Sequence, residues 1–327
     1  MAANSTVRLF AQICAYNEQD NISSVIAEIP RAIPGVAEVK VLVVDDGSRD
    51  GTVRVAEQAG ADYVVQHRGN KGLARAFQTG VDACLAHGAD IIVNIDADGQ
   101  YRGDEIPALI APILARRADI VIGDRQTQTL MHFSARKRLL QRIGSSMVQL
   151  ASGTRMPDAV SGFRAYTRDA ALRLFVTSTF SYTVQTLIQA GKLGLALASV
   201  PINARETQRP SRLHRGTLHF ISQQASILVR TYITYEPLKT FGVLAAPFLL
   251  VGLALLLRLV LIAADQGGDL KGHVQSLMAG TISLVIGFLL VITGIIADRI
   301  RENRRLLDEL MYRVRKLAAQ QTDRDVD

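Results

Sequence analysis

The stretch Ile91–Gln100, "IIVNIDADGQ", joins an apolar run to alternating oxygen-bearing side chains. Two interpretations compete for it. One is a calcium loop, because residues 94–99 and Glu105 nearly match the EF-hand pattern. The other is a metal clamp at the end of a β-strand in an enzyme that uses a nucleotide. The rest of the chain decides between these two kinds of site.

The residues before the acidic turn favour the strand. Ile91–Ile95 holds three isoleucines and a valine, which suit a β-strand, whereas an EF-hand loop needs a helix on each side. The first ligand position is Asn94 rather than the usual aspartate. In an extended chain alternate side chains point to one side, so Asp96, Asp98 and Gln100 are the candidate metal ligands. Two carboxylates and an amide suit Mg²⁺ or Mn²⁺ held jointly with substrate phosphates.

Outward from this stretch, residues 1–212 alternate short β-branched runs with helical stretches. The strands are expected at Leu9–Ala15, Val39–Val44, Tyr63–Gln66, Ile91–Ile95, Ile120–Gly123 and Leu197–Ile202. The helices are expected at Asn21–Ala32, Gly51–Ala59, Gly72–His87, Asp104–Arg116 and Ala135–Ser152. This alternation predicts an α/β domain with a mostly parallel, Rossmann-like sheet covered on both faces.

Three of the expected strands end in polar clusters. The clusters are Tyr16–Glu18, Asp45–Ser48 and Asp96–Asp98. Ligands of open α/β sheets bind at the carboxyl ends of the strands, so these clusters predict one shared site.

The bulk composition indicates an anionic partner and a reducing compartment. The 327 residues carry a net charge of +7, which suits phosphates, nucleic acid or a membrane surface. The two cysteines, Cys14 and Cys84, lie in apolar surroundings without metal-ligand spacing and are expected to fill the core. No nucleic-acid-binding motif accompanies the basic charge, so nucleic acid is not an expected partner.

Two long apolar segments follow, Leu238–Ala264 and Gln275–Ala297. Each is long enough to cross the roughly 30 Å hydrocarbon layer as a helix; the alternative is a pair of buried core helices. Basic residues flank the pair on both sides, and the link Asp265–Val274 is short and nearly neutral. The positive-inside rule then predicts a multi-pass protein of the inner (cytoplasmic) membrane, with the domain before the spans and both termini in the cytosol.

The predicted domains are therefore 1–212, an α/β domain; 213–237, an amphipathic helix on the membrane surface; 238–298, two transmembrane helices; and 299–327, a basic helical tail. The tail carries an apolar stripe that suits the membrane or another subunit, and a homo-oligomer, dimer or tetramer, is possible on this basis. The stripe comprises Leu306, Leu307, Leu310, Met311, Val314 and Leu317.

Six motifs in order resemble one known family. They are Ala15–Glu18, Val43–Thr52, Asn70–Gly72, Asp96–Gln100, Gly123–Arg125 and Asp158–Arg164. Together they resemble the family 2 glycosyltransferases of GT-A fold, specifically the polyprenyl-phosphate glycosyltransferases related to dolichol-phosphate mannose synthase. The two-span C-terminal part is similar to the bacterial membrane-anchored members, which implies a place in cell-envelope glycan biosynthesis.

The resemblance implies a role for each motif. Residues implied in nucleotide binding are Ala15, Tyr16, Glu18, Asp45, Asp46, Asn70, Lys71, Gly72, Asp96 and Ala97. Residues implied in holding Mg²⁺ or Mn²⁺ on the donor diphosphate are Asp96, Asp98 and Gln100. Residues implied in catalysis are Asp98, Arg125, Arg142 and Asp158. Asp-Asp-Gly-Ser is also an ordinary turn and helix-cap sequence, so that motif has a structural explanation as well.

The chain departs from the family pattern in two places. Cys14-Ala15 stands where a proline often precedes the Tyr-Asn-Glu element, and Arg209-Pro210-Ser211-Arg212 replaces a Gly-Glu-Ser-Lys-like stretch near the membrane. Arg142, Arg209 and Arg212 are the expected contacts of the lipid phosphate. The altered stretch favours UDP over GDP in the donor.

The implied reaction transfers a sugar from a nucleotide-sugar to polyprenyl (undecaprenyl) phosphate with inversion, in a single displacement. The phosphate is already largely dianionic at neutral pH, so charge compensation matters more than a general base. Asp158 is expected either to act as a base or to orient an arginine. Two alternatives remain, a transferase for another membrane glycolipid or glycan and a non-catalytic membrane-tethered nucleotide- or Ca²⁺-binding regulator.

Overall fold

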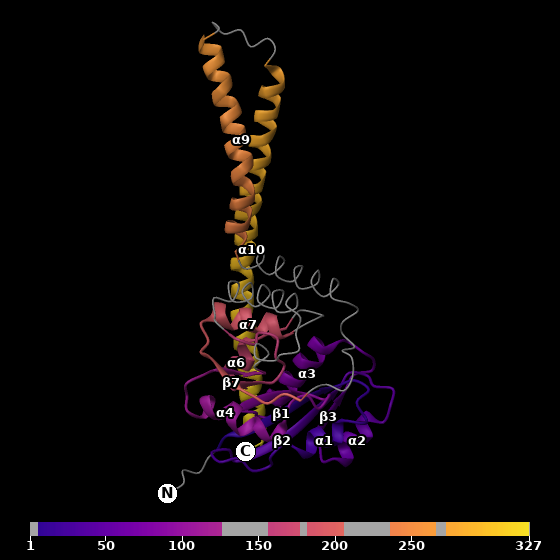
Figure 1. The fold of residues 1–327 in the computed structure, drawn as a ribbon. Helices are drawn as coiled ribbons and strands as arrows, with labels where there is room; N and C mark the ends of the chain where they lie inside the picture. Colours follow the sequence, from indigo (N-terminus) through magenta and orange to yellow (C-terminus); the bar gives the residue numbers. More distant parts are fainter. Residues whose placement is uncertain (1–5, 126–155, 177–181, 206–235, 266–272, 327) are drawn as a thin grey trace. The chain divides into compact units, whose positions relative to one another are not determined.

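The computed structural model describes residues 6–125, 156–176, 182–205, 236–265 and 273–326 (Figure 1). The chain divides into two compact units. One unit is Met1–Phe220 together with Leu310–Asp327, and the other is Ile221–Glu309. Helix α10 begins in the second unit and ends in the first, and the predicted tail 299–327 lies within its last part.

The first unit is built on one mixed sheet. Its strands are β1 Arg8–Ala15, β2 Glu38–Asp45, β3 Tyr63–Gln66, β4 Ile91–Asp96, β5 Ile120–Asp124, β6 Arg164–Thr167 and β7 Leu197–Pro201. Within the described residues they lie in the order β3-β2-β1-β4-β6-β5-β7. Strand β6 runs antiparallel to both β4 and β5, and the other pairs are parallel. The carboxyl ends of β1, β2 and β4 therefore meet at one edge, as the sequence predicts.

Most predicted elements are confirmed, with shorter helices. The helices of this unit are α1 Ile22–Ala27, α2 Thr52–Gln58, α3 Leu73–Ala86, the 3-10 helix η1 Gly103–Glu105 leading into α4 Ile106–Leu114, α6 Arg168–Arg173 and α7 Tyr182–Leu193. All six predicted strands are present, but β6, α6 and α7 are not among the predictions. The predicted helix Ala135–Ser152 lies outside the described residues.

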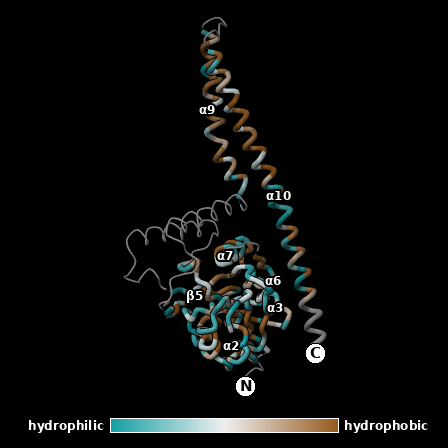
Figure 2. Tube along the Cα trace, turned by 90° about the vertical axis from the view of Figure 1, so that its right-hand side faces the viewer, coloured by the Kyte–Doolittle hydropathy of each residue, from teal (hydrophilic) through white to brown (hydrophobic). Residues whose placement is uncertain are grey.

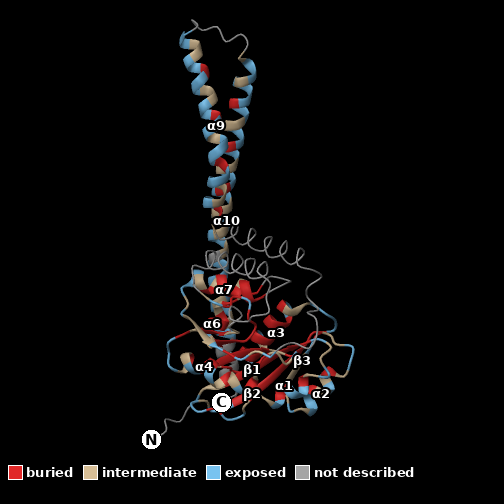
Figure 3. Cartoon of the chain, viewed as in Figure 1, coloured by how far each residue is buried: buried red, intermediate tan, exposed pale blue. Residues whose placement is uncertain are grey.

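Each face of the sheet is covered by helices, and the strands are the most buried part of the fold (Figure 3). One face packs against α1, α2 and α4, where Ile13 and Val41 of the sheet join Ile26 and Leu109 in one apolar cluster. The other face is covered by α3, α6 and α7. There Phe77 of α3 stacks on Tyr182 of α7, with ring centroids 4.0 Å apart. The sheet is therefore the middle layer of three, between two layers of helices.

The second unit is a hairpin of two apolar helices, α9 Pro237–Asp265 and the first part of α10 Val274–Val326 (Figure 2). Both helices are long and apolar enough to cross a membrane. The predicted spans lie inside them. Glycines 280, 287 and 294 of α10 face α9: a Cβ on Gly287 would lie 2.6 Å from Leu249 Cδ2. Small residues at a seven-residue spacing let two helices approach closely in a membrane.

Within the first unit, the end of α10 contacts α6 and α3 through polar side chains. Arg315 donates from Nη1 to the carbonyl oxygens of Ala171, Leu172 and Leu174, at 3.2, 2.8 and 3.0 Å, at the carboxyl end of α6. Its Nη2 donates to Asp82 of α3 at 2.5 Å. A guanidinium at a helix carboxyl end satisfies carbonyls that lack partners in the helix. The apolar stripe predicted in the tail remains exposed.

Candidate active site

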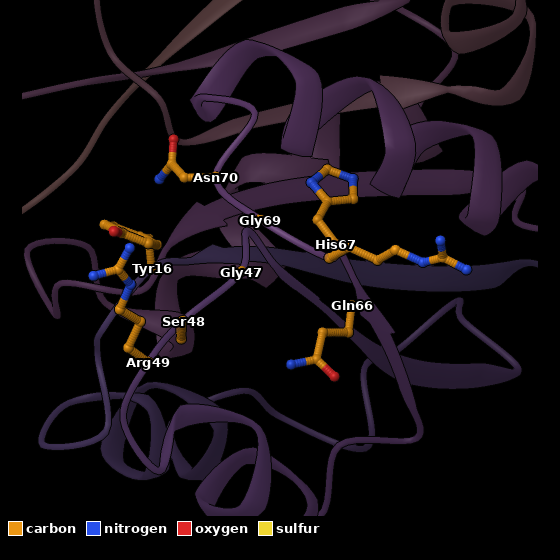
Figure 4. A pocket seen from close by; sticks show the side chains of 9 residues that line it. Tyr16, Gly47, Ser48, Arg49, Gln66, His67, Gly69 and Asn70 are labelled. Atoms are coloured by element: carbon orange, nitrogen blue, oxygen red, sulfur yellow. The ribbon is translucent and has the colours of Figure 1, made fainter.

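A cavity of about 460 Å³ opens where β1, β2 and β3 end (Figure 4). Its lining comprises Tyr16, Gly47, Ser48, Arg49, Gln66, His67, Arg68, Gly69 and Asn70. Tyr16 and Asn70 belong to the predicted nucleotide-binding set. The other lining residues are not in that set, and most of them carry polar side chains.

The loops after β1 and β2 are joined by their own polar groups. The backbone of Asn17, which has a φ of +54°, donates to Ser48 Oγ at 2.8 Å. In return, the Asn17 side chain accepts from the backbone of Arg49 at 2.9 Å. The Glu18 carboxylate accepts from Asn21 Nδ2 at 2.6 Å. The contacts of Asn17 tie the loop after β1, which carries Tyr16, to the loop after β2.

Asp45 and Asp46 have different surroundings. Asp45 is fully buried at the end of β2 and accepts from the backbone of Ser48 at 3.1 Å. Asp46 accepts from the backbone nitrogens of Lys71 and Gly72, at 2.9 and 2.8 Å, and contacts His67 Nδ1 at 2.8 Å. Both oxygens of Asp46 are therefore bonded to the protein, and its predicted contact with the nucleotide stays a prediction.

The acidic turn begins where β4 ends, at Asp96. Residues 97–98 form a turn and Gly99 has a φ of +73°, so the chain is not extended through Gln100. The expectation that alternation alone aligns the three ligands is therefore wrong. Asp96 and Asp98 are nevertheless close enough to interact electrostatically, and Asp98 is exposed. A strand before the turn also excludes the EF-hand interpretation, which needs a helix there.

Asp96 is held in an unusual electrostatic state. Burial and the charge of Asp98 raise the pKa of Asp96 to about 7, against the opposing influence of Arg125 and Arg164. Its Oδ1 atom is buried and has no hydrogen-bond partner among the described residues. A buried, unpaired carboxylate oxygen is costly unless a cation or a proton satisfies it.

Asp158 and Arg125 form an ion pair beside this turn. Arg125 Nε and Nη2 donate to the two carboxylate oxygens of Asp158 at 2.7 and 2.9 Å. Burial opposes the charge of Arg125, but its hydrogen bonds to Asp158 raise its pKa above the ordinary value. Arg125 thus remains a cation near Asp96, able to face a phosphate.

Arg164 holds the loop that carries Asp158 by hydrogen bonds to the loop's backbone. The sequence motif suggests no separate role for this arginine. The buried guanidinium donates to the carbonyl oxygens of Ala159, Ser161 and Thr183, at 2.7, 2.8 and 2.8 Å. Gly162 of the same loop lies against Asp96: a Cβ added to it would be 2.7 Å from Asp96 Oδ2. The Arg164 contacts therefore bring the loop backbone directly against the acidic turn.

The remaining predicted residues differ in how they reach the site. Ala15 and Ala97 are buried and Lys71 uses its backbone, so their side chains do not line the cavity. Gly72, with a φ of +91°, precedes α3. Arg142, Arg209 and Arg212 lie outside the described residues.

The residues from Gln66 to Gly69 are the part of the cavity that sequence reasoning missed. They follow β3, whose limits are predicted correctly as Tyr63–Gln66. The rule that ligands bind at strand ends applies to this strand too, and its polar end was the available signal.

Comparison with known proteins identifies the family of the chain. The model of a family described as glycosyl transferase family 2 matches residues 11–175, about half of the chain. The chain belongs to glycosyl transferase family 2. It is therefore a glycosyltransferase, and its mixed sheet with strand-end acidic turn is the GT-A-like fold of that family.

The names of two curated relatives refer to mannose on a polyprenol monophosphate or an undecaprenyl phosphate. Polyprenol monophosphomannose synthase of Mycolicibacterium smegmatis is 30% identical over 214 residues, which cover 62% of this chain and 79% of that protein. Undecaprenyl-phosphate mannosyltransferase of Micrococcus luteus is 29% identical over 212 residues, covering 62% of this chain and 85% of that protein.

A solved structure shares the fold. Glucosyl-3-phosphoglycerate synthase from Mycobacterium tuberculosis, crystallised with Mn²⁺, UDP-glucose and phosphoglyceric acid, is 24% identical with a TM-score of 0.54. The match covers 70% of this chain and 79% of that chain. At this identity the likeness concerns the architecture alone.

Proposed function

We propose that this glycosyltransferase transfers a sugar from a nucleotide-sugar to the phosphate of a polyprenyl phosphate, at the surface of the membrane that its own helices span. The observation that carries the proposal is the buried, unpaired oxygen of Asp96, which lies at the strand edge shared with the cavity. The names of the two curated relatives supply the acceptor class.

The residues of the acidic turn fit a divalent cation. Asp96 offers a buried oxygen with no partner in the described part of the chain, and Asp98 is exposed beside it. The described residues contain no group of three or more His, Cys, Asp or Glu that could hold a metal by themselves. A site with two carboxylates and Gln100 leaves positions for diphosphate oxygens, as Mg²⁺ and Mn²⁺ sites on nucleotides do.

The chain's own groups then divide the work of the reaction. Asp96, Asp98 and Gln100 would hold the cation, which would neutralise the departing nucleoside diphosphate. Tyr16 and Asn70 line the cavity for base and ribose. Arg125, oriented by Asp158, compensates charge on phosphate.

The attacking group needs little activation by the protein. A phosphate monoester has a second pKa near 6, so the acceptor attacks the anomeric carbon as a dianion in a single displacement with inversion. Arg142, Arg209 and Arg212 are proposed to receive the lipid phosphate.

The donor is proposed to carry UDP, on the ground that residues 209–212 differ from the mannose-synthase pattern. A GDP-sugar is the comparison that tests this choice. The cavity residues Gln66 and Arg49 are polar and suit the edge of either base.

The proposed topology places residues 1–212 in the cytosol, a surface helix at 213–237, two spans within 238–298 and the tail 299–327 back in the cytosol. The apolar lengths of α9 and α10 support the spans. A single cysteine introduced in the 266–272 link of a Cys14→Ser, Cys84→Ser protein would test it. Labelling of intact cells by an impermeant maleimide is expected there and not at a cysteine placed after Arg299.

The decisive experiment incubates purified protein with undecaprenyl phosphate, Mg²⁺ or Mn²⁺ and a panel of UDP- and GDP-sugars, followed by mass analysis of the lipid. A polyprenyl-phosphate monosaccharide is expected. Asp96→Asn and Asp98→Asn are expected to abolish it, while Asp104→Asn, an exposed acid on η1, is expected to leave it intact. Full transfer by the first two variants in the presence of metal would overturn the proposal.

One enzymatic alternative remains, transfer to another membrane glycolipid or glycan at the same surface. It predicts product with a sugar or diacylglycerol acceptor and none with polyprenyl phosphate. Membership of the family sets aside the non-catalytic regulator.

A further inference from the structure

Two loops form the walls of the cavity, and their backbones are in close contact at one point. One wall is the loop after β2, and the other is the loop after β3, residues 67–72. Gly47 has a φ of +76°, and a Cβ added to it would lie 2.6 Å from Gly69 Cα and 2.8 Å from Asn70 N. No side chain fits between the loops at this point, so the spacing of the walls depends on what holds the second loop in place.

Asp46 holds that loop from below. Only 3% of the residue is exposed, and its carboxylate accepts from the backbone of Lys71 at 2.9 Å and of Gly72 at 2.8 Å. Lys71 and Gly72 directly precede α3, and the amino end of a helix favours a negative charge. The aspartate therefore joins the end of β2 to the start of α3.

His67 completes the connection from the other strand. It is 6% exposed, its Nδ1 lies 2.8 Å from Asp46 Oδ1, and its Nε2 lies 3.0 Å from Thr79 Oγ1 of α3. A carboxylate oxygen only accepts, so Nδ1 carries the proton, and in the neutral ring Nε2 accepts from the threonine hydroxyl. One side chain thus connects the end of β3, the loop after β2 and helix α3.

We propose that His67 is a positioning residue for the donor nucleotide: acting through Asp46, it holds residues 67–72 against Gly47 and so sets the width of the cavity that receives the base and ribose. This rests on the proposed function. It assigns Asp46 a part in the architecture of the donor site, while Tyr16 and the loop backbones that line the cavity face the nucleotide. Loss of the hydrogen bond between His67 and Asp46 is expected to weaken donor binding and to leave acceptor binding unchanged.

Two substitutions of His67 separate its two hydrogen bonds. In His67→Asn the amide nitrogen takes the place of Nδ1 and keeps the bond to Asp46. In His67→Gln the longer side chain places its amide near the Nε2 position, which keeps Thr79 and loses Asp46. Both variants have similar volume and polarity, so a purely structural loss would affect them alike.

The measurements are the dissociation constants of UDP and GDP with Mn²⁺, by calorimetry on the full-length protein in detergent, and the KM and kcat for donor and acceptor. His67→Gln is expected to raise the nucleotide dissociation constant and donor KM about tenfold, as expected for loss of a buried hydrogen bond to a charged group. Its kcat and acceptor KM are expected to change less than about twofold. His67→Asn is expected to restore donor binding to within about threefold of the wild type.

A double-mutant cycle and a distant histidine provide the controls. Asp46→Asn alone is expected to raise the donor KM as His67→Gln does, and the double variant is expected to be no worse than either, because the two act through one bond. If His67→Gln does not fold, an unchanged donor KM in Asp46→Asn would overturn the inference. His87→Gln makes the same chemical change at a ring that stacks on Tyr63, with centroids 4.0 Å apart, outside the cavity lining, and is expected to have no effect on donor KM.

The outcomes distinguish this inference from the proposed function. Equal effects of the Asn and Gln variants on donor KM would overturn it, as would a loss of melting temperature and kcat with donor KM unchanged. A fully additive double variant would overturn it too. Failure of the wild type to bind either nucleotide would instead refute the proposed function.

Discussion

Asp158 accepts one hydrogen bond from Arg125 on each of its carboxylate oxygens, at 2.7 and 2.9 Å, and only 2% of its side chain is exposed. The backbone nitrogen of Arg125 adds a third contact at 3.3 Å. A carboxylate with both oxygens engaged by a cation is badly placed to take a proton from an acceptor. The geometry favours the second of the two expected roles, in which Asp158 orients the arginine.

Replacing this carboxylate tests the role directly. Asp158→Asn cannot form the two-point pair, so Arg125 loses its orientation and kcat is expected to fall about 100-fold or more, as for removal of one preorganised charge-stabilising group. Donor KM is expected to change little. Steady-state kinetics at saturating acceptor measure both constants.

A surface pair of the same geometry serves as the control. Arg102 donates to the two oxygens of Asp104 at 3.0 and 2.5 Å, but both side chains are exposed. Asp104→Asn is expected to leave kcat unchanged, because exposed pairs contribute little. Wild-type kcat in Asp158→Asn would contradict the orienting role.

The affinity for divalent metal is expected to depend on pH through Asp96. Its pKa is about 7, raised by burial and by Asp98, so below that pH a proton occupies the carboxylate that the cation needs. Binding of Mn²⁺ is expected to weaken about tenfold per pH unit below 7 and to level off above it. Calorimetry between pH 5.5 and 8.5 measures this.

The stability of the metal-free protein should show the opposite dependence. The folded state keeps the Asp96 proton up to about pH 7, whereas an unfolded chain with an ordinary aspartate pKa of about 3.9 has already lost it. The contribution of Asp96 to stability therefore decreases as the pH rises from about 4 to about 7. In Asp96→Asn this component should vanish from melting curves; its persistence would assign the dependence to another group.

The cysteines are expected to resist thiol reagents in the folded protein. Burial raises the pKa of Cys14 to about 12, and Cys84 is fully buried with its pKa also raised by burial. At pH 8 the thiolate fraction of Cys14 then falls by roughly 10³-fold, and thiolate is the reactive form. Maleimide labelling is expected only after denaturation. Rapid labelling of native protein would show that the face between β1 and α3 opens.

The helical hairpin is expected to depend on Gly287. Its Cβ position lies 2.6 Å from Leu249, so Gly287→Val should force the helices apart and lower the melting temperature in detergent by several degrees. Gly242→Val is the matched control, because nothing lies within 4 Å of its Cβ position. Equal melting temperatures of the two variants would argue against close packing of α9 on α10.

Sequence reasoning succeeded where a local pattern carries the information. The strands of the parallel half were found because each is a short β-branched run ending in a polar cluster, and β3 was placed at Tyr63–Gln66. Strand β6, with the sequence Arg-Ala-Tyr-Thr, lacks such a run, and only its position between β4 and β5 makes it a strand. Tertiary context overrides propensity in such a case.

In the candidate site, too, some features could be predicted from a local pattern and others could not. The acidic residues and Tyr16 can be predicted from their residue types and their positions after strands. The hydrogen bonds from Lys71 and Gly72 to Asp46 cannot, because they depend on two loops meeting in space. Strand β4 ends at Asp96, so side chains beyond it do not alternate as they do in a strand. A period of two in the sequence does not show where a strand ends. The partners of a side chain cannot be read from its neighbours along the chain.

The antiparallel strand β6 has a consequence for the order in which the molecule can assemble during synthesis. Strands β1 to β4 are neighbours in the sheet and emerge first, but β5 pairs only with β6 and β7 among the described strands and must wait for both. The loop from Asp158 to Gly162 enters the sheet directly through β6. A growing chain can therefore form the cavity at the ends of β1, β2 and β3 early, yet it brings the loop from Asp158 to Gly162 beside Asp96 only when β6 joins the sheet, so the complete candidate site is a late product of folding.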